Sequence, residues 1–152
     1  MKMNMRLAII TIGKGKNKAI HTLADDYLGR LKHYVNLEHI VAKDEADALK
    51  KISLREVASP DYVWLCEESG TQYTSKEFAD QFRVMQLYVR ATPRSAVFVI
   101  GDAAGHGDAM KARADGLLSF SKMTLPHEFA FVVLLEQIYR AFTILKGEPY
   151  HK

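Results

Sequence analysis

The segment LLSFSKMTLPHEFAFVVLLEQIYRAFTILKGEPYHK, residues 117–152, constrains how the rest of the chain must be arranged. It starts with a short apolar run of strand length. Pro126 then fixes φ at the start of a helix, and Gly147 followed by Pro149 ends that helix. Residues 129–135, FAFVVLL, are apolar at every position, whereas a surface helix shows one apolar stripe. The sequence therefore predicts a terminal helix that is covered on most sides.

Length and composition predict one soluble globular domain over residues 1–152. The chain is 48% hydrophobic and 26% charged, and its length suffices for one core of common size. Its apolar runs are shorter than the roughly 20 residues that a membrane helix needs, and no signal-peptide cleavage pattern follows the first of them. The single Cys66 cannot form an internal disulfide. We therefore expect a reducing compartment, by default the cytoplasm, and no membrane partner.

Charge is unevenly distributed along the chain. Residues 1–32 hold seven Lys and Arg against two acidic residues, residues 33–80 hold five against ten, and residues 81–152 hold nine against six. Two basic ends around an acidic middle permit a polyanion to bind on one face. A solvated surface produces the same asymmetry, so the charge alone leaves both interpretations open.

Strand-like and helix-like segments alternate along the whole chain. Apolar runs of strand length occur at residues 5–12, 37–41, 62–66, 95–100 and 117–121. Between them, helical patterns occur at residues 17–32, 44–57 and 106–115 and from Thr74 onward, where T-S-K-E forms a capping box. Continuous apolar runs are typical of strands covered on both faces. The sequence therefore predicts an α/β domain, a mostly parallel sheet with helices on both faces.

Ligands of open parallel sheets bind beyond the carboxyl ends of the strands. Four loops are expected there, at residues 13–17, 67–73, 101–107 and 122–125. The first, GKGKN, matches neither the Rossmann nor the Walker A pattern, so it is a basic loop that contacts nucleic acid or is merely solvated. The third, GDAAGHG, has three glycines in seven residues. It fits either close approach of the backbone to a ligand or a tight turn.

Several common kinds of catalytic site have no sequence signature here. The histidines and Cys66 do not follow zinc-ligand spacing, so no metal is expected. A G-x-S-x-G nucleophile motif is missing as well. The adjacent Glu67 and Glu68 are more typical of a solvated loop than of a catalytic carboxylate pair.

Three C-terminal stretches together resemble one family. SFSKMTLPH, EQIYRAFTILKG and EPYHK are similar to the bacterial 23S rRNA pseudouridine N3-methyltransferases, compact members of the SPOUT or α/β-knot superfamily. The similarity covers the whole chain in length and element order. It implies that the last strand and helix thread through a loop to form a trefoil knot, which spacing alone cannot show.

The resemblance also implies S-adenosylmethionine as methyl donor, bound in the knot by backbone groups of three loops. The matching positions are Leu65, Gly101, Phe120, Ser121, Lys122, Met123, Thr124 and Leu125. They coincide with three of the four loops selected from sheet geometry. Two departures from the family pattern bear on this site. The usual Gly-Gly is Gly101-Asp102, and a loop one residue longer leaves open whether Leu65 or Cys66 contacts the cofactor.

The implied reaction is methyl transfer to N3 of a pseudouridine in helix 69 of 23S rRNA on the assembled ribosome. N3 must lose a proton, and His151 is the candidate general base. Tyr150 would stack on or hydrogen-bond the nucleobase, and Arg140 would bind phosphate or stabilise the imide anion. Phe131 stands where the family commonly has a basic residue, which puts one RNA contact in doubt.

The family dimerises through the terminal helix, with the tail helping to form a site near the interface. A homodimer would supply the missing cover for FAFVVLL. The alternative is that this helix is the core helix of a monomer. At the level of function, one alternative is an RNA- or ribosome-binding α/β-knot protein without methyltransferase activity. A further alternative is a monomeric flavodoxin-like nucleotide-binding module.

Overall fold

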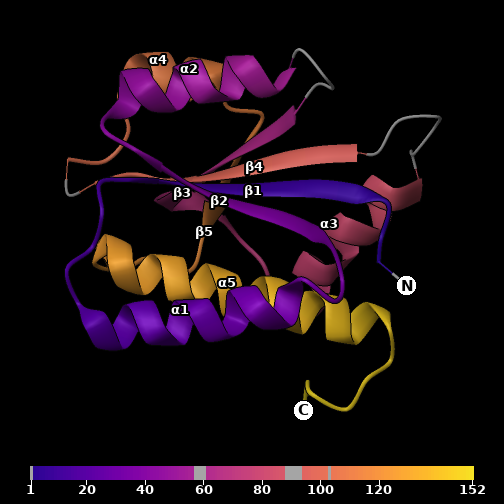
Figure 1. Cartoon of the computed structure of the whole chain (residues 1–152). Coiled ribbons are helices and arrows are strands. Elements are labelled where there is room, and N and C mark those ends of the chain that lie inside the picture. The colour runs from indigo at the N-terminus through magenta and orange to yellow at the C-terminus, as the bar shows by residue number, and fades with distance from the viewer. Residues whose placement is uncertain (1, 57–60, 88–93, 103) are drawn as a thin grey trace.

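Strands and helices alternate through the chain as the sequence predicts (Figure 1). The computed structural model describes residues 2–56, 61–87, 94–102 and 104–152. The elements are β1 (Met5–Ile12), α1 (Lys18–Leu31), β2 (Asn36–Ala42), α2 (Glu45–Glu56), β3 (Asp61–Gln72), α3 (Ser75–Leu87), β4 (Arg94–Ile100), α4 (Asp108–Arg113), β5 (Gly116–Ser119) and α5 (His127–Leu145). Val57, the last residue of one predicted helix, lies outside the described residues.

The strands form a parallel sheet in the order β2-β1-β4-β3-β5. At the centre, Leu7 of β1 is in register with Leu37 of β2 on one side and Ala96 of β4 on the other. A flavodoxin-like sheet has the order 2-1-3-4-5. The flavodoxin-like alternative is therefore wrong. The threading of the chain end stays a prediction, with which the positions of β5 and α5 are consistent.

Helices cover both faces of the sheet, which explains the continuous apolar runs. Met5, Leu7 and Ile9 of β1 pack on the side of α1, α3 and α5, whereas Ala8 and Ile10 pack on the side of α2 and α4. Figure 1 shows α2 and α4 above the sheet and the other three helices below it. The prediction of a parallel α/β sheet with helices on both faces is confirmed.

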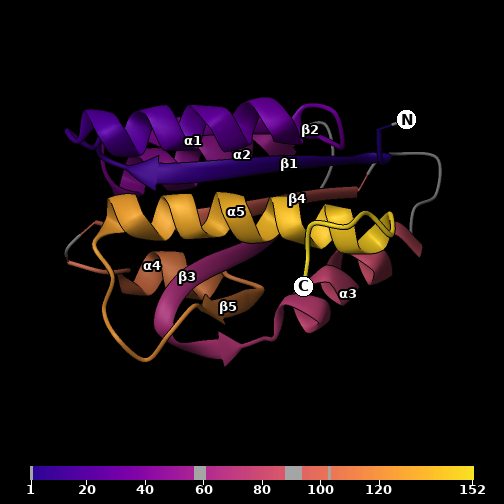
Figure 2. The same cartoon turned by 90° about the horizontal axis from the view of Figure 1, so that it is seen from below.

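Helix α5 is covered by the sheet and by the helices on either side of it (Figure 2). Leu134, Leu135 and Ile138 are fully buried, but Phe129 is 51% exposed and Val133 is half-buried. The helix therefore keeps an apolar strip at its first turns that this chain alone leaves in water. In the described part of the chain, none of the helices combines the length and the hydropathy needed to cross a membrane.

Side chains begin two helices as their sequences predict. Thr74 and Glu77 form the capping box, with the Thr74 N–H 2.9 Å from the Glu77 carboxylate and the Glu77 N–H 3.1 Å from the Thr74 hydroxyl. Asp44 caps α2 by accepting from the Asp47 N–H at 2.8 Å. The capping residues predicted from the sequence thus stand at the observed starts of both helices.

Strand β3 is longer than predicted, because the sequence indicates a strand at residues 62–66 followed by a loop. In the structure it pairs with β5 through Cys66, shifts register, and pairs again at Thr71 and Gln72. Gly70 makes the second pairing possible, because a Cβ there would lie 2.7 Å from the carbonyl carbon of Leu117. Residues 67–72, EESGTQ, are mostly polar, so a search for apolar runs does not detect this extension.

Replacing Gly70 with Ala should destabilise the protein, because the added methyl would meet main-chain atoms of β5 that cannot rotate away. We expect the free energy of unfolding in urea to fall by about 1–3 kcal/mol. Gly29→Ala is the matched control, since a Cβ there meets nothing within 4 Å and Ala favours the helix. Equal stability of the two variants would contradict the close contact.

Candidate functional site

The loop after β5 is tied to the end of β3 at the carboxyl edge of the sheet. The Ser119 hydroxyl donates to the main-chain oxygen of Glu68 at 3.1 Å. The Thr124 hydroxyl donates to the carboxylate of Glu68 at 3.2 Å. Within the loop, the Ser121 hydroxyl accepts from the Met123 N–H at 3.0 Å. Glu68 therefore positions the predicted cofactor loop, a role that its sequence context did not suggest.

A small hollow of about 60 Å³ lies between these segments. Its lining consists of Cys66, Glu67, Glu68, Phe120, Ser121, Met123, Leu125 and Ala130. Leu65 is not among them, because its side chain is buried on the α2 side of the sheet. Of the two positions left open by the sequence, Cys66 is the one that faces the hollow.

The loop after β4 folds into a tight turn. Gly105 has a φ of +77°, a conformation that favours glycine, and it forms an antiparallel bridge with Asp102. The Asp102 carboxylate accepts from the Ala104 N–H at 2.9 Å. Asp102 thus caps its own turn, which accounts for a carboxylate at this position without any cofactor contact.

His106 anchors the same loop, although no sequence motif singles it out. Its side chain is almost fully buried, and its Nε2 donates to the main-chain oxygen of Cys66 at 3.3 Å. The following Gly107 N–H donates to the Glu45 carboxylate at 2.8 Å. A Cβ on Gly101 would lie 3.1 Å from the His106 ring. The loop after β4 is therefore fixed against strand β3 and the start of α2.

The three predicted catalytic residues lie together at the other end of α5. Glu136 joins them: its carboxylate accepts from the Arg140 guanidinium at 2.6 Å and from the Tyr150 hydroxyl at 3.0 Å. Arg140 also lies 3.1 Å from Nδ1 of His151 and 4.8 Å from the centre of the Tyr150 ring. We call Glu136, Arg140, Tyr150 and His151 the tail cluster. The predicted roles of these residues require such proximity, and Glu136 is the member that was missed.

The contact with Arg140 indicates which ring nitrogen of His151 accepts a hydrogen bond. A guanidinium has only donors, so Nδ1 of His151 must accept and its ring proton is on Nε2. In this arrangement the basic lone pair is already engaged. His151 would accept a substrate proton at Nδ1 only after Arg140 has left that nitrogen.

Burial and hydrogen bonding keep Tyr150 a neutral donor. Burial raises the pKa of its phenol, and the neighbouring Tyr27 hydroxyl and Glu136 carboxylate raise it further. The Glu136 carboxylate likewise raises the pKa of Arg140. At neutral pH the tail cluster therefore presents a phenol and a positive guanidinium to whatever approaches it.

The predicted cofactor loop and the tail cluster lie at opposite ends of α5. The helix rises by 1.5 Å per residue, so the start of α5 and Arg140 are separated by about 20 Å along its axis. Figure 2 shows the tail over the C-terminal half of α5, away from the loop that precedes the helix. The structure thus separates the predicted cofactor loop from the predicted catalytic residues.

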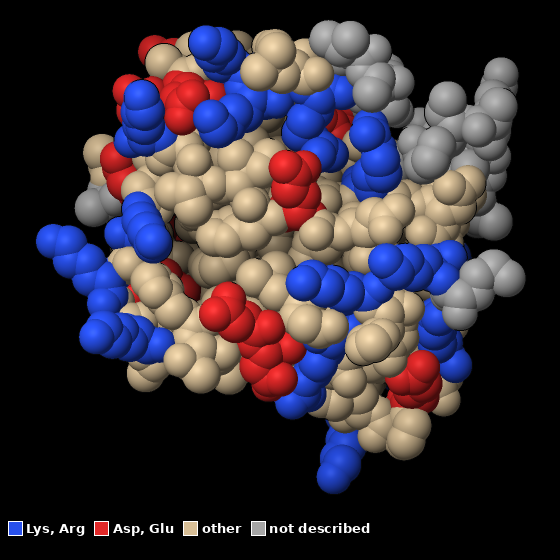
Figure 3. All heavy atoms as spheres, viewed as in Figure 1, with Lys and Arg blue, Asp and Glu red and all other residues tan. Residues whose placement is uncertain are grey.

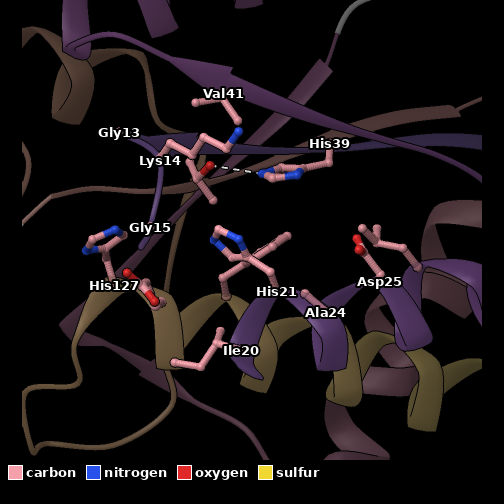
Figure 4. A pocket seen from close by; sticks show the side chains of 14 residues that line it. Gly13, Lys14, Gly15, Ile20, His21, Ala24, Asp25, His39, Val41 and His127 are labelled. Carbon is pink, nitrogen blue, oxygen red and sulfur yellow. Dashed lines mark hydrogen bonds between the residues drawn. The ribbon is translucent and has the colours of Figure 1, made fainter. Parts of the chain in front are cut away.

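A larger cavity of about 330 Å³, the α1 hollow, lies between the sheet, α1 and the start of α5 (Figure 4). His21 and His39 extend into it, and Lys14 reaches across it toward Val41. None of the predicted cofactor or catalytic residues lines it. The basic loop at residues 13–17 therefore borders a real cavity.

The family follows from comparison with known proteins. A family profile described as "Predicted SPOUT methyltransferase" matches residues 5–151. The chain belongs to the SPOUT methyltransferase family. This confirms the superfamily that the C-terminal motifs indicate, and it makes the chain a methyltransferase by family.

Related SPOUT proteins match over nearly their full length. The chain is 40% identical over 147 residues to Ribosomal RNA large subunit methyltransferase H of Koribacter versatilis (strain Ellin345), covering 97% of this chain and 98% of the relative. It is 38% identical over 162 residues to the protein of the same name from Clostridium botulinum (strain Kyoto / Type A2), covering 97% and 100%.

Solved structures share the fold at low sequence identity. A probable methylase family protein from Haemophilus influenzae Rd KW20 superposes with a TM-score of 0.57 at 14% identity, covering 99% of this chain and 72% of that one. The SpoU methyltransferase AviRb from Streptomyces viridochromogenes, solved with the cofactor AdoMet, gives a TM-score of 0.51 at 11% identity, covering 97% and 60%. These matches support the SPOUT fold.

The three loops fit S-adenosylmethionine (AdoMet) in the chemistry of their groups. Main-chain groups converge around Gly101, where a Cβ would already be in close contact. The hollow of about 60 Å³ is smaller than the 300 Å³ or more of a typical ligand site, so the loop has to shift to admit a cofactor. Met123, which is 78% exposed, makes few contacts that such a shift would break. Among the described residues, no group of three His, Cys, Asp or Glu side chains is placed to hold a metal ion.

Gly101→Ala should weaken AdoMet binding by about tenfold or more, because the methyl would push on Gly105 and the His106 ring and displace the loop. Isothermal titration calorimetry with AdoMet measures the effect. Gly29→Ala serves as the control and should bind like the wild type. Unchanged affinity in Gly101→Ala would remove this loop from the cofactor site.

Proposed function

We propose that residues 1–152 form one SPOUT methyltransferase domain that methylates N3 of a pseudouridine in helix 69 of 23S rRNA. The substrate would be the assembled ribosome in the cytoplasm, and AdoMet the methyl donor. The names of the relatives support a ribosomal RNA substrate, and the AdoMet complex of AviRb supports the cofactor. The nucleotide and its position rest on the resemblance of the C-terminal motifs.

The cofactor would be held by main-chain groups around Cys66, Gly101 and residues 120–125. Bound there, AdoMet supplies an electrophilic methyl group on its sulfonium. Of the eight positions expected from the motifs, Leu65 would contribute only through its neighbour Cys66, because its side chain packs on the α2 side of the sheet and does not line the hollow. The Glu68 contact with Thr124 would position the loop that closes the site.

The tail cluster would act on the uracil ring. His151 would accept the N3 proton once the nucleobase displaces Arg140 from Nδ1, and Arg140 would then be free to stabilise the developing imide anion. Tyr150 would hydrogen-bond or stack on the nucleobase. Glu136 would keep the guanidinium in place during this exchange.

The separation along α5 is the observation that carries the proposal of a homodimer. Methyl transfer needs the reacting atoms about 3–3.5 Å apart, but the cofactor loop and the tail cluster of one chain lie about 20 Å apart along the helix. A second copy with its α5 reversed would place its tail cluster at the cofactor loop of the first. The exposed Phe129 and half-buried Val133 give that contact an apolar strip.

The proposed function is tested in cells that lack this chain. Mass-spectrometric mapping of 23S rRNA should show that one pseudouridine in helix 69 has lost a methyl group. The wild-type gene should restore the methyl group, and Gly101→Ala should not. An unchanged methylation map would rule out this reaction. A chain that also fails to bind millimolar AdoMet would point to an RNA-binding protein without activity.

Mixing two inactive variants tests whether the site is shared between copies. His151→Ala should lower methylation by about 10²–10⁴ without weakening AdoMet binding, and Gly101→Ala should leave its own cofactor site mostly empty when AdoMet is supplied near the wild-type Kd. In a mixed dimer, one site combines the intact loop of one chain with the intact tail of the other. Refolding the two variants together should therefore restore about one quarter of wild-type activity.

Each variant refolded alone is the control for the mixing experiment. If the loop and the tail of the same chain formed the site, every site in the mixture would carry a defect and no activity would return. Full activity of His151→Ala by itself would instead remove the assignment of the general base.

A further inference from the structure

The α1 hollow has the size and the walls of a binding site for a flat ring. Its volume of about 330 Å³ falls within the range of small-molecule sites. Ile20, Leu28, Val41 and Phe131 give it apolar walls. The His39 ring stacks on Phe131 with a centroid distance of 4.4 Å. A planar, partly polar group can therefore lie against apolar and aromatic surface.

Polar groups are placed around these apolar walls. Thr11 Oγ1 and His39 Nε2 share a hydrogen bond of 2.9 Å, and the His21 ring extends from α1 into the same space (Figure 4). His127 Nε2 is buried, with no hydrogen-bond partner in the part of the chain that the structure describes. Burial lowers the pKa of His39, which favours a neutral ring at pH 7. The hollow thus offers hydrogen-bond donors and acceptors beside its apolar walls.

The charged residues around the hollow favour an uncharged ring inside it and a phosphate at its edge. Asp25 and Glu128 border the hollow and oppose an anion inside it. Lys14, Lys16 and Lys18 are exposed in and beside the loop at its edge. Figure 3 shows Lys and Arg side chains projecting from the end of the molecule at which α1 begins, next to a recess. An uncharged ring inside and a phosphate outside match this pattern.

The hollow is physically joined to the predicted cofactor loop. The Glu128 carboxylate, at the start of α5, accepts from the main-chain N–H groups of Lys16 at 2.8 Å and Asn17 at 3.3 Å. A Cβ on Gly15 would overlap the Glu128 side chain. The basic loop is thereby held against the helix that immediately follows residues 120–125. An occupant of the hollow would lie beside the cofactor loop.

We propose that the α1 hollow binds one unstacked nucleotide of the RNA substrate, with the base between α1 and β2 and the phosphate at Lys14. This rests on the proposed function in one respect, that the substrate is RNA. Single-stranded RNA is typically recognised through bases that leave the stack and lie on aromatic or apolar side chains, with lysines along the backbone. Of the motif SFSKMTLPH only His127 lines this hollow, and none of the predicted cofactor or catalytic residues does.

The test measures binding of fluorescently labelled hexauridylate by anisotropy at low salt. Val41→Trp fills the hollow from its exposed edge, and Lys14→Ala removes the phosphate contact. Val41→Trp should weaken binding by about tenfold, since stacking of a single base contributes that much or more. Lys14→Ala should weaken binding and reduce its dependence on salt, since one phosphate contact is lost. The matched controls lie outside the hollow: Val84→Trp, where the valine is 48% exposed against 44% for Val41, and Lys50→Ala on α2.

Calorimetry with AdoMet and light scattering on the same proteins test whether AdoMet or a second copy of the chain occupies the hollow instead of RNA. The proposal stands if both variants lose RNA affinity while the controls, AdoMet affinity and molar mass stay unchanged. It falls if the wild type does not bind hexauridylate or if the variants bind as the controls do. It also falls if Val41→Trp loses AdoMet affinity, making the hollow part of the cofactor site, or changes the molar mass, making it a contact between copies.

Failure of the hollow and failure of the proposed function are distinguishable. A hollow that binds hexauridylate in a chain whose loss leaves rRNA methylation unchanged would be an RNA site on a protein with another substrate. In the converse case, loss of the chain abolishes rRNA methylation while Val41→Trp still binds hexauridylate with wild-type affinity. That combination would place RNA recognition elsewhere on the surface.

Discussion

The apolar side of α5 packs against the sheet between α1 and α3, and the positions of both groups of candidate residues follow from this contact. Leu134, Leu135 and Ile138 are fully buried there, and each contributes about 1.5–3 kcal/mol relative to an exposed side chain. A helix held along its length by such burial cannot slide or bend at low cost. Its first turn therefore holds one loop at the carboxyl edge of the sheet, and its last turns hold the tail cluster.

If the two groups form one active site, as we propose, this rigidity implies that two copies of the chain assemble. A straight helix separates the loop before it from Arg140 by about 20 Å, so packing that stabilises the fold also prevents one chain from joining the two groups. The free apolar strip at Phe129 lies at the loop end of the same helix. Burying that strip against a second copy would bring the tail cluster of that copy to the cofactor loop. One contact would then both stabilise the dimer and complete the proposed active site.

Much of the fold follows from the sequence because its main signals are local. Continuous apolar runs predicted buried strands, and the Thr74 capping box predicted the start of α3. What the sequence did not predict depends on contacts between distant residues. The extension of β3 relies on Gly70 meeting β5, and the anchoring of the glycine-rich loop relies on His106 reaching Cys66. Glu136 was missed because a carboxylate on an amphipathic helix normally faces solvent.

The same distinction between local signals and contacts of distant residues applies to the candidate site. Motif resemblance selected Arg140, Tyr150 and His151, and the structure shows the contacts among them, including one that occupies the lone pair of the expected base. The basic loop after β1 gave no decisive signal, because its meaning depends on Glu128, which lies 112 residues from Lys16 in the chain. That carboxylate holds the loop against the helix that follows the cofactor loop. The fold thereby places a partly apolar cavity with a basic loop at its edge next to the predicted cofactor loop, and a substrate that contacts both would be aligned by the fold itself.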